Sequence, residues 1–431
     1  MPSTVLRWGV QSLVPQLVLR RAARRGQVGA QLAVDRALWD DPFPTYEQMR
    51  ARGPLLRDRL VDATASHAVA EEVLRSPAFR VGLGSPDRLP WGTRLLLSLA
   101  ADPWALGPAE PPSMLAVDPP EHARYRRLVS NVFTPRSVAA LGPRVEQIAG
   151  ELLDQMAGRD GVDLVEAYAA PLPVRVIAEV LGIPVRMQPQ LLEWGNAAAV
   201  MLDPALTYRQ FRAAVKALGQ IHAWLADHLL VLRKHPGDNL LSRLAVAEED
   251  GDRLDDVELR TTALLLIGAG FETTVNLLAN GAVQLVDHRD QLDALRRDPT
   301  LWPNAVEEVL RFDSPVQVTV RIAGTDTHLS GEPVPSGRFV SLMLGGANRD
   351  PDVFADPQRF DVHRANAREH LAFSAGIHYC LGAGLARLEG TTGLRMLFER
   401  FPDLALAGGA RRRNLRVLRG YDRLPVTLRP G

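Results

Sequence analysis

Over most of the chain, hydrophobic and polar positions alternate with the period of an α-helix. Between positions 119 and about 310, the apolar residues recur three or four places apart, as in Leu218, Ile221, Leu225 and Leu229. Residues at this spacing share one face of a helix and can be buried together. We therefore predict that this part of the chain is mainly helical.

Four shorter segments have a different pattern. They are rich in β-branched residues and are bounded by Gly or Pro, and they cover 55–63, 316–322, 338–344 and 416–428. This pattern predicts short strands that form small sheets beside the helical body. The sequence contains no internal repeat or low-complexity tract that would divide it into separate units. The expected fold class is therefore mainly α with small β-sheets (α+β), in one main domain.

The first residues are apolar and are followed by basic residues. The apolar run 5–19 precedes Arg20, Arg21, Arg24 and Arg25. It is interrupted by polar residues and Pro, and it lacks the small-residue cleavage site of a signal peptide. We favour an amphipathic surface helix over loose membrane association. The longest other apolar stretch, 263–271, is far shorter than the roughly 18 residues of a bilayer span, so we expect no integral membrane segment and a cytoplasmic protein.

Composition narrows the possible functions. The chain has 431 residues, of which 46% are hydrophobic and 23% charged, as in an ordinary folded protein with a sizeable core. Its 50 basic residues balance its 50 acidic residues, which argues against nucleic acid as a partner. The single cysteine, Cys380, can form neither an internal disulfide nor a multi-cysteine zinc site. It is a core residue, a nucleophile or an axial metal ligand.

The surroundings of Cys380 favour the third role. The segment reads Phe373-Ser-Ala-Gly376-Ile-His378-Tyr-Cys380-Leu-Gly382 and continues into a helical pattern. The sulfur should therefore lie at a helix N-terminus, where the macrodipole and free N–H groups favour a thiolate. Gly376 and Gly382 would let the backbone turn sharply and approach a flat ligand closely.

This pattern resembles the haem-binding loop Phe-x-x-Gly-x-His/Arg-x-Cys-x-Gly of the haem-thiolate monooxygenases, the cytochromes P-450. The resemblance implies that Cys380 is the axial ligand of haem iron and that Phe373 packs near its sulfur. The other haem-binding positions that it implies in this segment are Gly376, His378, Gly382 and Ala386. The cofactor would be haem b, held without covalent attachment because no C-x-x-C-H signature is present.

A second motif lies in a long helical stretch, 255–287. Asp255 and Glu258 have the spacing of a capping box, and the middle of the stretch reads Gly268-Ala269-Gly270-Phe271-Glu272-Thr273. Glycine inside a helix costs about 1 kcal/mol relative to alanine, so either a neighbouring helix or a ligand should approach this face closely. Glu272 and Thr273 can relay protons, and a mid-helix Thr can bond the carbonyl of the preceding turn and open the helix.

The motif is similar to the oxygen-activating helix of the same family. The resemblance implies that Ala269 and Gly270 lie against the haem and that Glu272 and Thr273 are catalytic.

A third pair, Glu308 and Arg311, is three residues apart and can form an ion pair on one helix face. Alone it would be an ordinary surface pair of little energetic value. In the family, a helix with this spacing is completed by an arginine from a later segment, which is matched here by Arg359. The resemblance implies a structural network of Glu308, Arg311 and Arg359 that supports the Cys380 loop.

The segment 118–127 predicts a helix that begins after two prolines and carries His122 and Arg126 on one face. Haem propionates need cationic hydrogen-bond donors when they are partly buried. By resemblance, His122, Arg126, Arg321 and His378 would supply them.

The resemblance extends from about residue 40 to the C-terminus, and residues 1–39 form an N-terminal extension. It implies a single-domain cytochrome P-450 fold, 40–431, with haem between the long central helix and the Cys-loop helix. It also implies a soluble bacterial enzyme that receives electrons from ferredoxin and ferredoxin reductase. Arg124 and Arg127, with Arg387, would form the patch on which an acidic ferredoxin docks.

The implied function is a monooxygenase that activates dioxygen and hydroxylates or epoxidises a bulky hydrophobic small molecule, such as a natural product, steroid, terpene or lipid. The expected pocket is apolar and includes Trp91, Trp104, Trp194 and Met201. The alternative is a haem-thiolate ligand-binding or sensor protein without oxygenase turnover. The intact pair Glu272 and Thr273 favours the oxygenase, because a sensor needs no proton relay.

Overall fold

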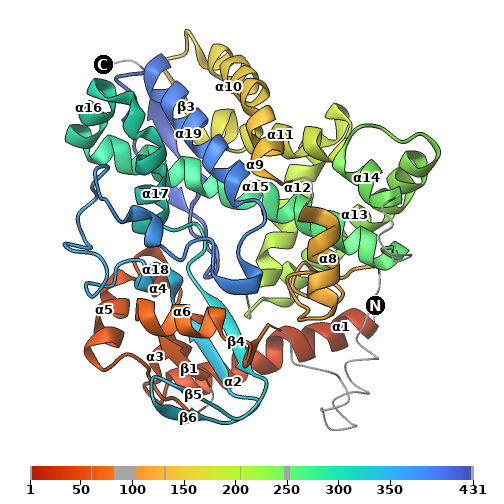
Figure 1. Cartoon of the computed structure of the whole chain (residues 1–431), viewed down its shortest axis with the longest axis vertical. Coiled ribbons are helices and arrows are strands. Elements are labelled where there is room, and N and C mark those ends of the chain that lie inside the picture. The colour runs from red at the N-terminus through yellow and green to blue at the C-terminus, as the bar shows by residue number, and fades with distance from the viewer. Residues whose placement is uncertain are drawn as a thin grey trace.

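The computed structural model describes residues 2–59, 61–81, 102, 104–130, 133–203, 205–246 and 253–428. Figure 1 shows a larger helical part, built around α15, and a smaller part in which α3, α5 and α6 accompany a sheet. The helices are α1 (Pro2–Trp8), α2 (Val14–Ala23), α3 (Val28–Val34), α4 (Ala37–Asp40), α5 (Phe43–Ala51), α6 (His67–Arg75), α8 (Glu121–Ser130), α9 (Pro135–Ala140), α10 (Gly142–Met156), α11 (Pro171–Leu181), α12 (Gln188–Ala199), α13 (Tyr208–Lys234), α14 (Leu240–Val246), α15 (Asp256–Asp287), α16 (Arg289–Arg297), α17 (Trp302–Phe312), α18 (Leu344–Ala347) and α19 (Ala383–Arg400). The expected mainly helical fold with small sheets is confirmed.

Helix α15 is the centre of the helical part. It has 32 residues, and Asp255 and Glu258 form the predicted capping box at its start. It contacts α11, α12, α13, α17 and α19, so it is surrounded by other helices. Among the described residues, α15 is the helix long and apolar enough to cross a membrane, but 78% of its most apolar window is buried inside the protein. A helix that is hydrophobic all round in this way is a core helix.

The strands form small sheets. They are β1 (Val61–Thr64), β2 (Phe79–Arg80), β3 (Gly161–Asp163), β4 (Thr319–Ala323), β5 (Thr327–Leu329), β6 (Glu332–Val334), β7 (Phe339–Leu342), β8 (Ala405–Leu406), β9 (Arg411–Arg412), β10 (Tyr421–Arg423) and β11 (Pro425–Thr427). In the four-stranded sheet the order is β1-β7-β4-β2, and β1 pairs with β7 in parallel. Each of the four predicted strand segments contains strand residues, although in the first, 55–63, strand β1 occupies only the last three positions. Strands of two or three residues, such as β2 and β3, are too short to show an alternating pattern.

The N-terminal residues pack against the body of the protein. A π-helical turn at Gly9–Leu13 joins α1 to α2 without a break, and Figure 1 shows this helical segment beside the lower, sheet-containing part. The buried guanidinium of Arg7 pairs with Glu110 at 2.5 Å. The indole N–H of Trp8 donates to the carbonyl oxygen of Leu206 at 2.9 Å.

Candidate active site

A cavity of about 900 Å³ lies between α15 and the loop that precedes α19. The predicted site residues come to its wall from distant parts of the sequence. Those that line it are His122, Arg126, Ala269, Gly270, Glu272, Thr273, Arg321, Phe373, His378, Cys380, Gly382 and Ala386. Among the predicted haem-binding residues, Gly376 is the exception.

One turn of α15 is open to this cavity. From Leu259 to Leu285 every residue is buried except Gly268, Ala269, Gly270 and Thr273, and all four line the cavity. This buried helix therefore has a single opening, on the side that faces Cys380.

The two glycines of this turn serve different purposes. A Cβ on Gly270 would lie 2.8 Å from the side chain of Ile177, so this glycine permits close packing of α15 on α11. A Cβ on Gly268 would meet nothing within 4 Å. Both explanations offered for the glycines thus apply, helix packing at Gly270 and an open wall beside the cavity at Gly268.

The hydroxyl of Thr273 donates to the carbonyl oxygen of Ala269 at 3.0 Å, as expected for a mid-helix threonine. The expectation that this bond opens the helix is wrong, because α15 continues through this turn without a break. The adjacent Glu272 is buried and forms an ion pair with Arg413, which follows strand β9. Burial lowers the pKa of Arg413, and the nearby charge of Asp422 opposes this effect.

Cys380 lies deep in the protein, yet its side chain is accessible because it faces the cavity. Its backbone N–H donates to the carbonyl oxygen of Phe373 at 2.9 Å, which closes the loop. Burial raises the pKa of the Cys380 thiol, although the Gly382 N–H and the charges of Arg126 and Arg387 oppose the rise. The helix terminus thus favours a thiolate, as predicted, through the Gly382 N–H, but burial outweighs this effect in the protein alone. A coordinating metal ion is what deprotonates such a thiol.

The two glycines of the Cys380 loop also differ. Gly376 has a φ of +67°, and a Cβ there would lie 2.3 Å from the carbonyl oxygen of Leu74 at the end of α6. The positive φ confirms the predicted sharp turn; Gly376 packs against the backbone of α6 and is not among the residues that line the cavity. A Cβ on Gly382 would meet nothing within 4 Å, so this position leaves room above Cys380.

Two arginines and two histidines gather at one side of the cavity. His122 and Arg126 come from α8, Arg321 from β4 and His378 from the Cys380 loop. The imidazole centres of His122 and His378 are 4.2 Å apart. Burial, helped by the charges of His378 and Arg126, lowers the pKa of His122 to about 4. Burial also lowers the pKa of Arg321 to about 10.

Among the described residues, the cluster of His122, Arg126, Arg321 and His378 has few acidic partners. The Nε2 atom of His378 is buried without a hydrogen-bond partner, and the nearest carboxylate oxygen, on Asp118, is 3.8 Å away. Buried cations without counter-charges are costly, so the site favours a ligand that carries negative charge. Two carboxylates of a flat ligand that reaches Cys380 would satisfy it, and the residues present fit haem.

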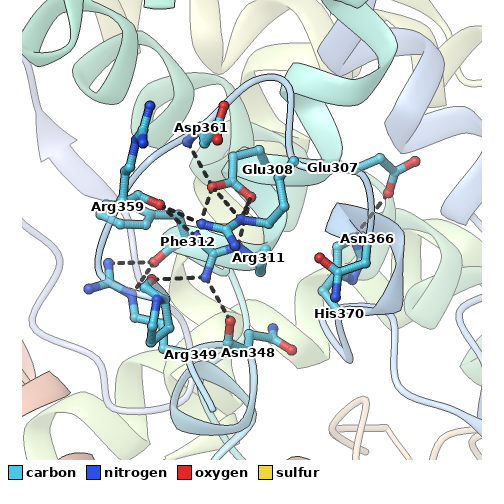
Figure 2. A network of polar contacts seen from close by, with 12 residues as sticks. Glu307, Glu308, Arg311, Phe312, Asn348, Arg349, Arg359, Asp361, Asn366 and His370 are labelled. Carbon is cyan, nitrogen blue, oxygen red and sulfur yellow. Dashed lines mark hydrogen bonds and ion pairs between the residues drawn. The ribbon is translucent and has the colours of Figure 1, made fainter. Parts of the chain in front are cut away.

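The network around α17 (Figure 2) has a buried ion pair at its centre. Glu308 and Arg311 form two hydrogen bonds of 2.7 and 2.8 Å, and neither side chain is exposed. Arg311 also donates to the carbonyl oxygens of Asn348 and Arg359 at 3.0 and 3.1 Å. In Figure 2 the Arg359 side chain points away from Glu308.

The predicted role of the Arg359 side chain is therefore wrong. The second guanidinium on Glu308 belongs to Arg364, whose Nε lies 3.2 Å from the carboxylate. Arg359 contributes only its backbone carbonyl, which accepts hydrogen bonds from both Arg311 and Arg364.

Glu307, the residue next to Glu308, was missed as a functional candidate. Its buried carboxylate accepts hydrogen bonds from Arg387 at 2.7 Å and from His370 at 3.0 Å. Burial alone would raise the pKa of Glu307, but these partners outweigh it and hold the pKa at about 2. The Arg387 guanidinium lies 4.6 Å from the ring centre of Phe373. Glu307 thus joins α17 to both ends of the Cys380 loop.

Two of the three arginines predicted to form the ferredoxin-docking patch are engaged in ion pairs within the protein. Arg124 forms hydrogen bonds of 2.8 and 3.0 Å with Glu258 at the start of α15, and Arg387 binds Glu307. Arg127 is exposed. Arg124 and Arg387 are thus integrated into the fold and do not form an open patch of cations.

The residues predicted to line the substrate pocket lie in different places in the structure. Trp194 lines the cavity. Trp104 is 51% exposed, and the guanidinium of Arg260 lies over its indole ring, 4.6 Å from the ring centre. Met201 packs against the main hydrophobic core, and Trp91 lies outside the described residues.

A buried cavity with a cysteine on one wall, an open helical turn opposite and a cationic rim has the architecture of the haem-thiolate proteins. Comparison with known proteins agrees. Residues 200–409 match the model of the family "Cytochrome P450". The chain is 48% identical to "Putative cytochrome P450 140" of Mycobacterium tuberculosis over 94% of this chain and 93% of the relative. It is 40% identical to "Vitamin D(3) 25-hydroxylase" of Pseudonocardia autotrophica over 91% and 95% of the two chains.

Among solved structures, "Structure of the tirandamycin C-bound P450 monooxygenase TamI" matches with a TM-score of 0.81 and 36% identity, over 92% of this chain and 99% of the other. The chain therefore belongs to the cytochrome P450 family. It is an oxygen-incorporating oxidoreductase, and its cofactor is haem b.

Proposed function

We propose that this protein hydroxylates or epoxidises a bulky hydrophobic small molecule and receives its electrons from ferredoxin and ferredoxin reductase. The observation that carries the proposal is that Cys380 and the open turn of α15 face the same cavity. Much of the remaining wall is apolar and includes Trp194, Val316 and Leu418. Haem and substrate together would share the 900 Å³ of this cavity.

The proposed haem site uses the residues on the cavity wall. Cys380 would be the axial ligand, and His122, Arg126, Arg321 and His378 would hold the propionates. When bound, haem supplies an iron centre that binds dioxygen and activates it for insertion into an apolar substrate.

The proposed catalytic residues lie on the open turn of α15. The Thr273 hydroxyl is on the cavity wall, where it can hold a proton donor at the face opposite Cys380. The neighbouring Glu272 is buried, also borders the cavity and forms an ion pair with Arg413. Thr273 would pass protons into the cavity, and Glu272 would receive them from outside when its ion pair with Arg413 opens.

The proposed substrate class is supported by the printed names of the relatives. One relative is named a vitamin D(3) 25-hydroxylase, and one similar structure contains tirandamycin C. Both names indicate bulky ligands. An apolar wall with a few placed polar groups suits such a ligand.

The proposed electron donor would dock on the face that carries the Cys380 loop. Ile377 in this loop is 53% exposed, and the exposed Arg127 belongs to α8, which supplies part of the haem site. An acidic ferredoxin would be steered toward such a surface, and its docking would weaken with salt.

The test is oxygen incorporation. The haem-loaded protein is incubated with a ferredoxin system, ¹⁸O₂ and a panel of steroids, terpenes, macrolides and fatty acids, and products are examined by mass spectrometry. We expect one ¹⁸O atom in a product of at least one apolar substrate. Tight substrate binding with complete absence of labelled product, in the presence of working reductases, would support the ligand-binding alternative.

A further inference from the structure

The first helical segment of the chain presents apolar side chains to the outside of the molecule. Val5, Val14 and Leu17 are 49%, 56% and 56% exposed, and none of them lines the cavity. Val14 and Leu17 are three positions apart in α2 and therefore lie on one face of that helix. Adjacent large apolar side chains on a surface mark an interaction site more often than single ones do.

Basic residues follow directly on this face. Arg21 is four positions after Leu17, and Arg20, Arg24 and Arg25 are its neighbours; all four arginines are exposed. The sequence before Asp35 contains no acidic residue, although the chain as a whole has a net charge of zero. Positive charge is thus concentrated beside the exposed apolar residues.

The segment is held firmly in place. The Arg7 side chain is 2% exposed and binds Glu110 and the carbonyl oxygen of Ala105, at 2.5 and 2.9 Å. Trp8 donates to the carbonyl oxygen of Leu206. Because these contacts fix α1 against the body, the outer face of the segment is a constant feature of the surface.

The inner face of the same helix borders the proposed active-site cavity. Pro15, Leu19 and Ala22 line it. A single helix therefore separates the cavity from the exposed apolar strip.

We infer that this surface, Val14 and Leu17 together with Arg20, Arg21, Arg24 and Arg25, rests on an anionic lipid membrane. An interfacial helix buries apolar side chains at the boundary of headgroups and acyl chains, while its basic residues pair with lipid phosphates. A second copy of this chain fits less well, because its identical arginines would repel those of the first. With the strip on the membrane, the cavity beneath α2 lies next to the bilayer, where apolar substrates accumulate.

The inference goes beyond the proposed oxygenase activity, and its test needs no turnover. The haem-loaded full chain is mixed with vesicles of phosphatidylcholine and phosphatidylglycerol (7:3) or of phosphatidylcholine alone, and bound protein is separated by flotation. We expect binding to the anionic vesicles that 0.5 M salt reverses, and weak binding to the neutral ones. Failure to bind the anionic vesicles would overturn the inference, as would equal, salt-independent binding to both.

Paired variants locate the surface. Arg21→Gln with Arg24→Gln should lower partitioning onto anionic vesicles about 25-fold, or roughly fivefold for each charge. Val14→Asp with Leu17→Asp should lower it at least about tenfold, because two apolar contacts become charged. The matched controls are Arg136→Gln with Arg297→Gln, and Val185→Asp, which changes a side chain that is 76% exposed elsewhere on the surface.

The controls should bind vesicles like the parent protein. An equal loss in the controls would show that binding is non-specific and would contradict the inference. A change in sedimentation mass of the Val14 and Leu17 variant without a change in lipid binding would assign the strip to contacts between copies. The haem absorption spectrum and melting temperature of each variant would show that it is folded, so a failure of the lipid test is separate from a failure of the oxygenase proposal.

Discussion

Two groups of buried charges lie near the Cys380 loop, and they differ in whether the protein itself balances them. Around α17, Glu307 and Glu308 meet arginine or histidine partners at 2.7 to 3.2 Å. On the cavity wall, Arg126 and Arg321 have pKa values lowered by burial, and the neighbouring His378 has an unsatisfied nitrogen. The first group is complete, as expected of a structural network, whereas the second is arranged for a ligand that brings negative charge.

This difference predicts opposite effects of removing a charge. In the complete network a substitution leaves a buried partner unpaired and destabilises the fold. In the cavity cluster a substitution of an arginine removes a charge that burial disfavours, so the haem-free protein keeps its stability and loses affinity for haem.

The largest effect is expected for Glu308→Gln. It removes the charge that Arg311 and Arg364 share, and breaking a buried pair of this kind costs about 3–5 kcal/mol. Urea unfolding should therefore show a much lower midpoint or little folded protein. The matched control is Arg359→Ala, whose side chain points away from Glu308 and which should change stability by less than about 0.5 kcal/mol. Equal losses in the two variants would contradict the assignment of Arg364.

Glu307→Gln should have the next largest effect, and one that depends on pH. Its folded-state pKa of about 2 is below the ordinary 4.5, so its contribution is fully present above pH 4.5 and is lost as pH falls toward 2. The difference corresponds to about 3 kcal/mol at neutral pH. Melting temperatures between pH 3 and 7 should converge for parent and variant at the acid end. A constant difference across this range would show that the charge of Glu307 is not what stabilises the loop.

Arg126→Met should have a smaller effect, on haem and not on the fold. We expect the melting temperature of the haem-free protein to be unchanged or slightly raised. Loss of one charged hydrogen bond to a propionate, worth about 1.5–3 kcal/mol, should speed haem transfer to a scavenging protein about 10- to 150-fold. A destabilised haem-free protein with normal haem retention would show that Arg126 stabilises the fold and does not bind haem.

Thr273→Ala should have the smallest effect on stability, because Thr273 belongs to neither group of charges and its hydroxyl bonds only to the Ala269 carbonyl in the same helix. We expect haem content to remain and product formed per electron consumed to fall several-fold, with electrons diverted to peroxide. Thr273→Ser, which keeps the hydroxyl, should restore most of the coupling. Unchanged coupling in Thr273→Ala would remove this residue from the proton relay.

The sequence was informative where structure is encoded locally. The capping box of Asp255 and Glu258 depends on a three-residue spacing, and the Cys380 loop and the open turn of α15 are each contiguous in the chain. Helical periodicity likewise predicted the long helices, because their core-facing residues recur within one or two turns.

Contacts between distant segments were not predictable in the same way. Arg413 reaches Glu272, and Arg364 replaces Arg359 on Glu308, only because of how separate segments meet in the folded chain. With many arginines in the sequence, no local pattern marks the ones that become buried partners. The raised pKa of Cys380 has the same origin, since burial by the whole fold outweighs the local helix terminus.

The most direct test of Cys380 as the iron ligand is the absorption spectrum of the dithionite-reduced, carbon monoxide-bound protein, compared between the parent and Cys380→Ala. We expect the long-wavelength Soret band of thiolate-ligated haem in the parent and its loss in the variant. A parent protein that binds haem but shows the shorter-wavelength band of imidazole ligation, or a variant that retains the thiolate band, would contradict the assignment of Cys380 as the iron ligand.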